Sequence, residues 1–414
     1  MNEKKIVVIG AGPAGMMAAL RAADFAQQVT LIEKNPSSGK KLLLSGKGRC
    51  NLTNACEIDS FIQRFSSGGE FLRDAFKKFF NQELMEFFET RGLRLKVERQ
   101  MRVFPVTDRS DSIVDLLNKE LKKRGVAVVC ATKAVEIMVI DKAVAAVMTD
   151  QGKTIVADRV VLATGGVSYG LTGSSGDGIR FAANTGHRII PPRPGLVPLE
   201  VAESYPRALE GLTLKNISLR FSCAKQELIS EVGELMFTGF GISGPLVLTL
   251  SGKIADWLLT KNKVYVAVDL KPALSFEQLE ARLFREFKEN AKKGIKNALK
   301  TLLPQRMIGV FLGILKIDPD KKANQITQPE RKAILSLFKE FRMEVSRALP
   351  IEVAMITRGG VSLKDINPRT MESRRVAGLY FAGEIIDVDA DTGGFNLQAA
   401  FSTGYLAGES AARP

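Results

Sequence analysis

The order of apolar and polar positions along the chain predicts a sheet of parallel strands joined by helices. An apolar strand over residues 5–9 leads through a glycine turn into a helical pattern, and a second apolar strand follows over 29–33. Further strands are predicted over 126–130, 134–139, 143–148, 154–157 and 159–166, and helices over 71–92 and 112–124. Strands that alternate with amphipathic helices are typical of α/β folds.

The turn after the first strand has the glycine spacing of a dinucleotide-binding site. Gly10 permits the tight turn, Gly12 lets a pyrophosphate approach the backbone, and Gly15 lets the helix pack closely on the sheet. The N–H groups that begin the helix then face the phosphates, and the helix dipole also favours negative charge there. Glu33 ends the second strand, where its carboxylate can accept hydrogen bonds from an unphosphorylated ribose.

A change of pattern divides the chain into a discontinuous domain and an insert. The Pro-rich stretch 191–194 marks the first boundary. Strands are predicted over 196–201, 214–221 and 264–270, mainly helical spacing over 275–349, and one more buried strand over 378–384. We therefore expect a nucleotide-binding domain over 1–190 and 356–414. Its insert over 191–355 is expected to be β-rich over 191–274 and helical over 275–349.

Composition excludes several classes of protein. With 45% hydrophobic and 25% charged residues, the 414-residue chain has the composition of a globular protein. No apolar stretch reaches the 18 or so residues of a membrane helix, and no signal peptide is recognisable, so a cytoplasmic location and no membrane partner are expected. Four cysteines without CxxC spacing and a single histidine, His187, argue against a disulfide framework and a metal site. The oligomeric state stays open.

The chain is strongly basic, with a formal net charge of +14. Residues 275–349 hold 16 Lys and Arg against 9 Asp and Glu, so this segment supplies half of the excess positive charge. Such a segment suits phosphate contacts with RNA, and it suits a solvated helical face equally well.

A second glycine-rich stretch, near the C-terminus, points to FAD. The strand over 378–384 ends on Gly383 and Glu384, and Asp387 and the pair Gly393–Gly394 follow before a helix begins. An acidic residue there can hold a ribityl hydroxyl, and a helix N-terminus can face the flavin edge that becomes negative on reduction. The alternative is an ordinary last strand and helix of the sheet. Because no second GxGxxG follows a strand, NAD(P)H is expected only as a transient electron donor.

The loop Ser45-Gly-Lys-Gly-Arg-Cys-Asn-Leu-Thr-Asn54 is glycine-rich and cationic, and it can wrap a flavin or its phosphates. It resembles the SGGGRCNxTN signature of the BaiN/RdsA-like flavoprotein family. Further stretches that agree with this family are Ala163–Gly166, Gly186–His187, Phe237–Pro245, Gly359–Val361, Thr370–Ser373 and Gly383–Gln398. The resemblance therefore extends from Ile6 to Gly408.

The resemblance implies an α/β fold, in which a Rossmann-like FAD-binding domain of the two-dinucleotide-binding flavoprotein type is interrupted by a β-barrel-like insert with a helical subdomain. It also implies an FAD-dependent oxidoreductase. One branch of the family reduces a uracil of large-subunit ribosomal RNA to dihydrouridine, and others resemble bile-acid C=C reductases or an aminoacetone oxidase. This chain departs from the family at Gly239, where a His is frequent, at Phe395, which replaces a Tyr, and at Gly170, which replaces a Pro.

The motifs together define the expected cofactor-binding residues. These are Gly10, Gly12, Pro13, Ala14, Gly15, Glu33, Lys34, Lys41, Ser45, Gly46, Gly48, Arg49, Cys50, Asn51, Val135, Thr164, Gly165, Gly166, Gly383, Glu384, Asp387, Gly394, Phe395, Asn396, Leu397 and Gln398.

The leading hypothesis is reduction of a uracil C5=C6 bond in ribosomal RNA that binds through residues 275–349. Hydride would pass from the reduced flavin to C6, and C5 would need a proton. Cys50 is the candidate donor, since a thiol has an ordinary pKa of about 8.5. The alternative for Cys50 is a small buried residue beside the flavin, and for His187 a structural role is favoured.

Three other functions remain open. A small-molecule enzyme, acting as a bile-acid-like enone reductase or an aminoacetone-type amine oxidase, would bind its substrate without regard to salt. A catalytically idle flavoprotein that binds RNA would keep its FAD without turnover. A monooxygenase shares the fold, but no nicotinamide or halide motif supports it.

Overall fold

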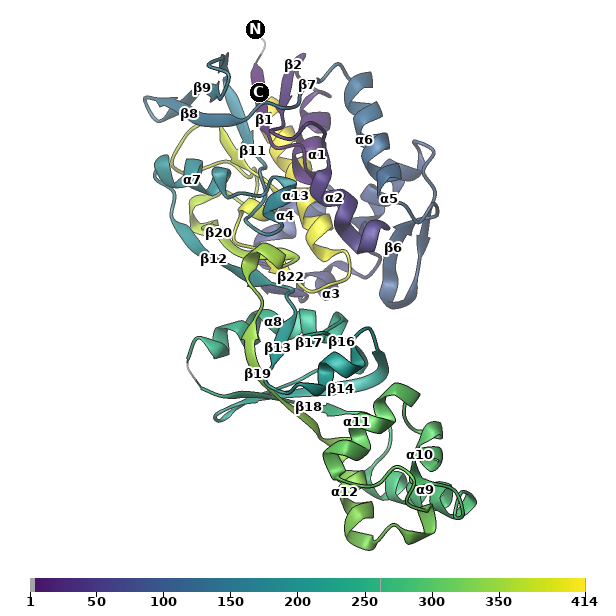
Figure 1. The fold of residues 1–414 in the computed structure, drawn as a ribbon. Coiled ribbons are helices and arrows are strands. Elements are labelled where there is room, and N and C mark those ends of the chain that lie inside the picture. The colour runs from purple at the N-terminus through teal and green to yellow at the C-terminus, as the bar shows by residue number, and fades with distance from the viewer. Residues whose placement is uncertain (1–3, 261, 414) are drawn as a thin grey trace. The chain divides into compact units, whose positions relative to one another are not determined.

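The computed structural model describes residues 4–260 and 262–413, and the chain divides into two compact units (Figure 1). The first unit comprises Met1–Gly195 with Ile351–Pro414, and the second comprises Leu196–Pro350. The Pro-rich stretch 191–194, expected to mark the first domain boundary, lies in strand β12 (Ile189–Gly195), which pairs antiparallel with β20 (Ile356–Val361) just before the second unit begins. Proline is accepted there because a two-stranded ribbon leaves every strand an open edge.

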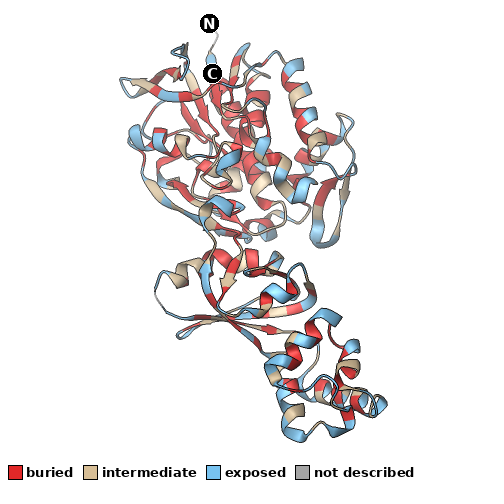
Figure 2. Ribbon diagram, in the orientation of Figure 1, coloured by how far each residue is buried: buried red, intermediate tan, exposed pale blue. Residues whose placement is uncertain are grey.

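The first unit is built on a parallel sheet of five strands. Their order is β21 (Leu379–Phe381), β11 (Arg159–Leu162), β1 (Lys5–Ile9), β2 (Gln28–Ile32) and β7 (Ala127–Val129). All four pairings are parallel, as the alternating pattern predicts. The predicted meander is present as β8 (Ala134–Ile140), β9 (Ala143–Thr149) and β10 (Thr154–Val156). Figure 2 shows the centre of this unit as buried.

Helices α1 (Pro13–Ala22) and α13 (Phe395–Ala412) pack on this sheet and on each other. A Cβ at Gly404 would lie 2.2 Å from the Ala14 carbonyl oxygen, and one at Gly408 would lie 2.2 Å from that of Ala18. The two helices therefore run in the same direction with their backbones in contact, side by side in Figure 1. Only glycine permits this distance, which fixes how far each helix N-terminus reaches along the sheet.

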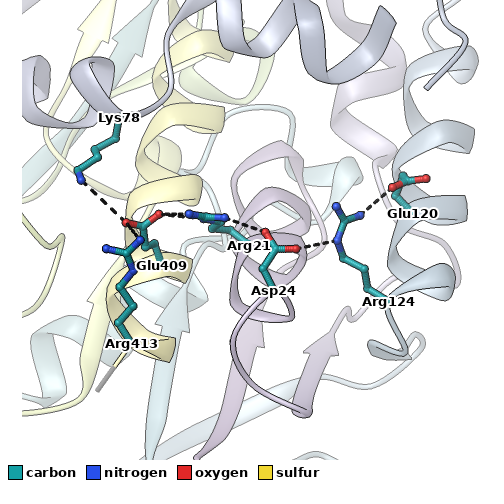
Figure 3. A network of polar contacts seen from close by, with 7 residues as sticks. All are labelled: Arg21, Asp24, Lys78, Glu120, Arg124, Glu409 and Arg413. Carbon is teal, nitrogen blue, oxygen red and sulfur yellow. Dashed lines mark hydrogen bonds and ion pairs between the residues drawn. The ribbon is translucent and has the colours of Figure 1, made fainter. Parts of the chain in front are cut away.

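A chain of ion pairs joins these helices to α6 (Asp111–Lys123) at the ends opposite their N-termini (Figure 3). The buried carboxylate of Glu409 accepts a hydrogen bond from Arg21 Nε at 2.9 Å, and Arg21 Nη1 contacts Asp24 at 2.9 Å. Arg124 then bridges Asp24 at 3.0 Å and Glu120 at 2.7 Å. The predicted helix over 112–124 is thus confirmed and held against α1.

The single helix predicted over 71–92 is wrong, since the chain forms α4 (Arg73–Lys78) and α5 (Asn81–Glu89). The break falls at Phe79, whose ring stacks on Tyr405 with centroids 4.5 Å apart. The backbone leaves the helical path there, with a φ of −155° at Phe79, and the Phe79 carbonyl oxygen accepts hydrogen bonds from Gln398 Nε2 at 3.3 Å and from Ser402 Oγ at 2.5 Å. The remaining elements of this unit are α2 (Lys40–Leu44), β3 (Thr53–Asn54), α3 (Ile58–Ile62), β4 (Phe65–Ser67), β5 (Leu95–Val97), β6 (Arg102–Pro105), α7 (Asp177–Asn184) and β22 (Asp389–Ala390).

The second unit contains a closed antiparallel barrel. Its strands are β13 (Leu199–Val201), β14 (Thr213–Cys223), β16 (Gly233–Thr238), β17 (Gly241–Ser243), β18 (Val264–Asp269) and β19 (Phe341–Ala348), with β15 (Gln226–Ile229) as a hairpin on β14. Pairing runs β14-β16-β17-β13-β19-β18, and β18 returns to β14, which closes the ring. The β-barrel-like insert implied by the family resemblance is therefore confirmed.

Along the chain, the helices of this unit are inserted between barrel strands. They are α8 (Pro245–Leu258), which comes before β18, and α9 (Phe276–Glu289), α10 (Ile295–Ala298), α11 (Gln305–Leu315) and α12 (Gln328–Lys339), which come between β18 and β19. Ser275 and Thr327 cap α9 and α12 with capping boxes. The helical pattern expected up to 349 is wrong at its end, because Phe341, Met343 and Val345 alternate with exposed or half-buried residues and form β19. No helix in the described residues is long and apolar enough to cross a membrane.

Candidate cofactor site

The three glycines of the first turn occupy the environments that their predicted roles require. Gly10 has a φ of +100°, and a Cβ there would lie 2.6 Å from the Ala163 carbonyl oxygen. A Cβ at Gly15 would lie 1.8 Å from the Gly10 carbonyl oxygen, so these two glycines are required by packing. A Cβ at Gly12 would meet no atom of the described residues within 4 Å. The space in front of Gly12 is thus open to a phosphate.

Glu33 joins the glycine turn to the end of β2. Its buried carboxylate accepts hydrogen bonds from the backbone N–H of Ala11 and that of Asn35, both at 2.8 Å. The Asn35 side-chain amide also donates to Glu33 Oε1, at 2.7 Å, so of about four acceptor positions one remains for a ribose hydroxyl, on Oε2. Lys34 points elsewhere, with its ammonium 2.9 Å from Asp177 at the start of α7.

Glu384, which follows β21, contacts residues from several elements. It contacts Lys41 Nζ at 2.6 Å and accepts hydrogen bonds from Thr357 N at 2.8 Å and from Ser168 Oγ at 3.2 Å. The backbone N–H of Gly166 approaches the same carboxylate at 3.4 Å. The expected residues Lys41, Gly166 and Glu384 are therefore brought together.

Sequence reasoning missed Ser168 and Thr357. Thr357 Oγ1 accepts hydrogen bonds from Val167 N at 2.8 Å and Ser168 N at 3.0 Å, and it lies where a Cβ at Gly166 would be. The available signal was the position of Thr357 two residues before the glycine pair 359–360, one of the stretches that matches the family.

Thr164 carries a buried hydroxyl that has no hydrogen-bond partner in the described part of the chain. Burying an unpaired hydroxyl costs about 1–3 kcal/mol. Thr164 follows β11 at the same edge of the sheet as the first turn. A Cβ at Gly10 would lie 3.0 Å from Thr164 Cα. The orphaned hydroxyl and the open space at Gly12 both fit a polar group of a bound dinucleotide.

The loop 45–50 holds an unusual run of left-handed backbone. Gly46, Lys47, Gly48 and Cys50 have φ values of 58°, 58°, 83° and 60°. Lys47 and Cys50 are not glycines, so each costs of order 1 kcal/mol, and such strain concentrates at ligand-binding loops. A Cβ at Gly48 would meet none of the described atoms within 4 Å, which leaves this backbone open to a ligand.

Hydrogen bonds join this loop to the start of α13. The Asn51 amide accepts from Gly394 N at 3.1 Å. Asn54 Nδ2 donates to the Gly393 carbonyl oxygen at 3.2 Å, and Thr53 Oγ1 contacts Gln398 Oε1 at 2.6 Å. The loop 45–54 and the stretch 383–398, both expected beside one flavin, therefore lie next to each other.

The side chains that begin α13 shape the site and point away from it. Gln398 is fully buried and donates to Ser402 Oγ at 2.9 Å, while Asn396 donates to the Ala390 carbonyl oxygen at 2.9 Å. The ring of Phe395 meets that of Phe61 edge to face at 4.7 Å. A cofactor role at this helix start therefore falls to backbone N–H groups, since Leu397 offers only an apolar side chain.

The register of the two helices sets the length of the site. Gly404 contacts Ala14 in the first turn of α1, whereas α13 already begins at Phe395, nine residues earlier. At 1.5 Å per residue, the N-terminus of α13 lies about 12 Å beyond that of α1. An elongated cofactor with phosphates at one helix start and a ring system at the other suits this offset.

Two expected cofactor residues have other partners. Arg49 donates from Nε to Asp108 at 2.8 Å and lies over the Phe104 ring at 4.2 Å, so its charge is neutralised within the protein. Val135 lies on the exposed edge strand β8, in a pocket described below.

Cys50 is completely buried, and this burial raises the pKa of its thiol to about 12. Such a thiol stays protonated at neutral pH and gives up its proton poorly, so its surroundings favour the packing alternative. By contrast, burial together with the nearby Asp389 raises the pKa of Asp387, which is half-buried.

His187 has the structural role that was favoured. Its Nε2 lies 2.7 Å from Ser373 Oγ, and its Nδ1 lies 3.1 Å from the Ala182 carbonyl oxygen. Burial lowers the pKa of the imidazole. Among the described residues, no group of three or more His, Cys, Asp or Glu could hold a metal ion.

Gly239, the departure from the family pattern, lies in the second unit between β16 and β17. A Cβ at this position would lie 3.1 Å from Glu210 Oε2. The space that a histidine side chain would enter is bordered by this carboxylate.

Comparisons with known proteins identify the family of this chain. Residues 4–410 match the family described as the HI0933-like protein Rossmann domain. A 3-dehydro-bile acid delta(4,6)-reductase from Clostridium scindens is 32% identical over 410 residues, 99% of each chain. A ribosomal RNA dihydrouridine synthase from Escherichia coli is 29% identical over 98% of this chain and 97% of the relative.

Solved structures share the fold at low identity. A 3-ketosteroid-delta4-(5alpha)-dehydrogenase from Rhodococcus jostii superposes with a TM-score of 0.54 at 15% identity, over 100% of this chain and 97% of that one. Quinol-fumarate reductase from E. coli superposes with a TM-score of 0.52 at 17% identity, over 99% and 70% of the two chains. Because the family match covers nearly the whole chain, the protein belongs to the HI0933-like family of FAD-dependent oxidoreductases.

Proposed function

We propose that this protein reduces a carbon–carbon double bond conjugated to a carbonyl group, and that its substrate is a uracil of large-subunit ribosomal RNA in the cytoplasm. The two curated relatives support the reaction type, because a 3-oxo steroid with a Δ4 bond and a uracil with its C5=C6 bond are both such acceptors. Each takes a hydride at the carbon distant from the carbonyl and a proton at the carbon beside it.

Different residues of the site would hold different parts of the cofactor. The start of α1 at Gly12 would hold the pyrophosphate, Glu33 the adenosine ribose, and the start of α13 with Asn51 the flavin end. FAD, when reduced, supplies a hydride to such acceptors. NAD(P)H is the proposed electron donor and would dock transiently.

The chain offers two candidate groups that could donate the proton to the substrate. Cys50 remains the prediction from the sequence, although a pKa of about 12 makes it a weak acid at pH 7. Burial raises the pKa of Asp387, which brings this carboxyl group closer to the neutral pH at which a general acid must work. If Cys50→Ala retains FAD and full turnover while Asp387→Asn retains FAD and loses turnover, Cys50 is eliminated as the donor.

A lysine cluster in the second unit is the observation that carries the RNA substrate. Ile295 N donates to the Lys321 carbonyl oxygen at 2.8 Å, and Ala323 N donates to that of Lys293 at 3.0 Å. This antiparallel pairing places the segment 292–293 beside 321–322, so four lysines gather on two adjacent loops. Lys292 and Lys322 are exposed and have no ion-pair partner in the described ranges. Such unneutralised cations are suited to backbone phosphates.

Nucleoside mass spectrometry of ribosomal RNA tests the proposal. Cells that lack the gene should lose one dihydrouridine of the large subunit, and the wild-type gene should restore it. Lys322→Glu should restore it poorly, whereas Lys225→Glu, an equal charge change on the exposed β14–β15 turn, should restore it fully. Unchanged dihydrouridine in the deletion strain would refute the RNA substrate.

A small-molecule enone is the second candidate, favoured by the bile-acid relative of full length. In that case the purified enzyme should reduce a free enone such as a 3-oxo-Δ4 steroid at a rate independent of salt and of Lys322→Glu. Binding to RNA should instead weaken steeply with salt, with a slope that falls by about 0.7–0.9 for each phosphate contact removed. If the protein retains FAD but neither substrate reoxidises its reduced flavin, it is the catalytically idle RNA-binding flavoprotein.

A further inference from the structure

A second pocket lies in the first unit, apart from the glycine turns. Its volume is about 910 Å³, and it is lined by strand β8, by the end of α7 and by the loop 374–376. Of all expected cofactor residues it includes only Val135. Lys142 and Val376 lie just before β9 and β21, at the amino ends of these strands, whereas Gly10, Thr164 and Gly383 lie at carboxyl ends. The cofactor site and the far end of this pocket are therefore at opposite edges of the sheet.

The pocket follows the edge of a strand. The three-stranded sheet has the order β10-β9-β8, so β8 has no partner strand on its outer side among the described residues. The consecutive residues 135, 136 and 137 all line the pocket, together with Val139. The pairing of β8 with β9 shifts register between Ala134 and Glu136 and again between Met138 and Val139, so strict alternation of faces is interrupted there and neighbouring side chains of this outer strand line one pocket. Figure 1 shows β8 as an outer strand, with α7 beneath it.

The pocket lining has an apolar part and a charged part, and most of its charges are positive. Valine and isoleucine side chains of β8 and the ring of Phe181 form its apolar part. Lys142, Arg374 and Arg375 supply three positive charges against the one carboxylate of Glu136. Arg375 is paired with Asp365 at 2.9 Å, while Lys142 is exposed and has no ion-pair partner in the described chain.

We propose that this groove binds an extended, acidic peptide segment of a partner protein, which adds as a further strand to β8. An unpaired strand edge offers alternating N–H and C=O groups, and proteins use such edges to capture extended peptides. The seven residues of β8 span about 23 Å, enough for main-chain pairing with a short segment. The excess of positive charge at the Lys142 end selects acidic side chains on that segment.

The only histidine of the chain lies beside the groove and serves as a reporter. His187 Nδ1 is 3.0 Å from Oγ1 of Thr185, a lining residue. Its Nε2 contacts Ser373 Oγ, which accepts hydrogen bonds from the N–H groups of Arg375 and Val376 at 2.9 Å each. Binding in the groove should therefore shift the imidazole NMR signals of a protein that has no other histidine.

The test uses the full-length, FAD-loaded protein and an eight-residue, fluorescein-labelled peptide that alternates glutamate and valine. Anisotropy should report saturable binding, with a matching shift of the His187 signals. The same peptide with alternate backbone nitrogens methylated should bind about tenfold more weakly, because it cannot pair with a strand. A lysine–valine peptide should bind more weakly still.

Lys142→Glu should weaken binding of the acidic peptide about fivefold. Lys153→Glu, in the β9–β10 turn of the same sheet and outside the lining, should leave it unchanged. Equal binding of the methylated peptide, absence of a His187 shift, or tighter binding of octauridylate than of the acidic peptide at this site would overturn the proposal. None of these outcomes depends on the substrate of the flavin site.

Discussion

Gly12 provides a direct test of where the cofactor pyrophosphate lies. Its backbone, with φ −81° and ψ −176°, is accessible to any residue, and a Cβ there meets no described atom within 4 Å. Gly12→Ala should therefore leave the fold of the FAD-free protein intact. The added methyl group would instead occupy the space through which a phosphate approaches the helix start.

The size of the effect follows from the N–H groups at that helix start. Pro13 has no N–H, and Met16 N bonds to the Gly12 carbonyl oxygen, so the N–H groups of Ala14 and Gly15 remain for the phosphates. Hydrogen bonds to charged groups contribute about 1.5–3 kcal/mol each. Loss of both bonds would amount to about 3–6 kcal/mol, which raises the Kd for FAD by about 10²–10⁴.

The assay is titration of the FAD-free protein with FAD, followed by flavin fluorescence, alongside thermal unfolding without FAD. The matched control is Gly309→Ala in helix α11, where a Cβ also meets none of the described atoms within 4 Å. This control should gain up to about 1 kcal/mol of stability and keep its affinity for FAD. Wild-type affinity in Gly12→Ala would refute the placement of the pyrophosphate.

Three further predictions concern buried polar groups. Thr164→Val should leave the FAD-free protein equally stable or about 1 kcal/mol more stable in urea unfolding, yet weaken FAD binding about tenfold, because the orphaned hydroxyl would lose its ligand. Glu409→Gln should lower the free energy of unfolding by about 2 kcal/mol, since Arg21 would keep its charge without its buried partner; an unchanged urea midpoint would contradict this. The lowered pKa of His187 means that unfolding takes up a proton, so its contribution to stability is complete above about pH 6.5 and declines below it. His187→Asn should therefore flatten the decline of the urea midpoint between pH 7 and pH 5.

The pattern of apolar residues was sufficient to predict the parallel strands of the main sheet, and the glycine motifs with the family resemblance predicted FAD. The first turn carries much of its information locally, because a Cβ at Gly15 would meet the Gly10 carbonyl oxygen within the same strand–turn–helix unit, whereas Gly10 is required by a contact with Ala163 after β11. The barrel strands over 214–221 and 264–270 were also found, since their side chains alternate over enough residues to show a period of two.

The errors arise where tertiary contacts outweigh local pattern. The break at Phe79 is accompanied by contacts with α13, more than 300 positions away along the chain, which local pattern does not indicate. Two site residues that stay predictions also have surroundings set by distant parts of the chain. Arg49 is paired with Asp108, and Cys50 is completely buried.

The same contrast indicates where members of this family can diverge in substrate. The cofactor position depends on glycines at 404 and 408, whose Cβ atoms would overlap the backbone of α1, so these positions tolerate almost no change. Gly239 is different, because its neighbour is the carboxylate end of Glu210, which can move aside. Its replacement by histidine would place an imidazole beside a carboxylate, which favours the protonated ring. Substitutions in the barrel turns and in the lysine cluster are therefore expected to change substrate binding while they leave the flavin site of this chain intact.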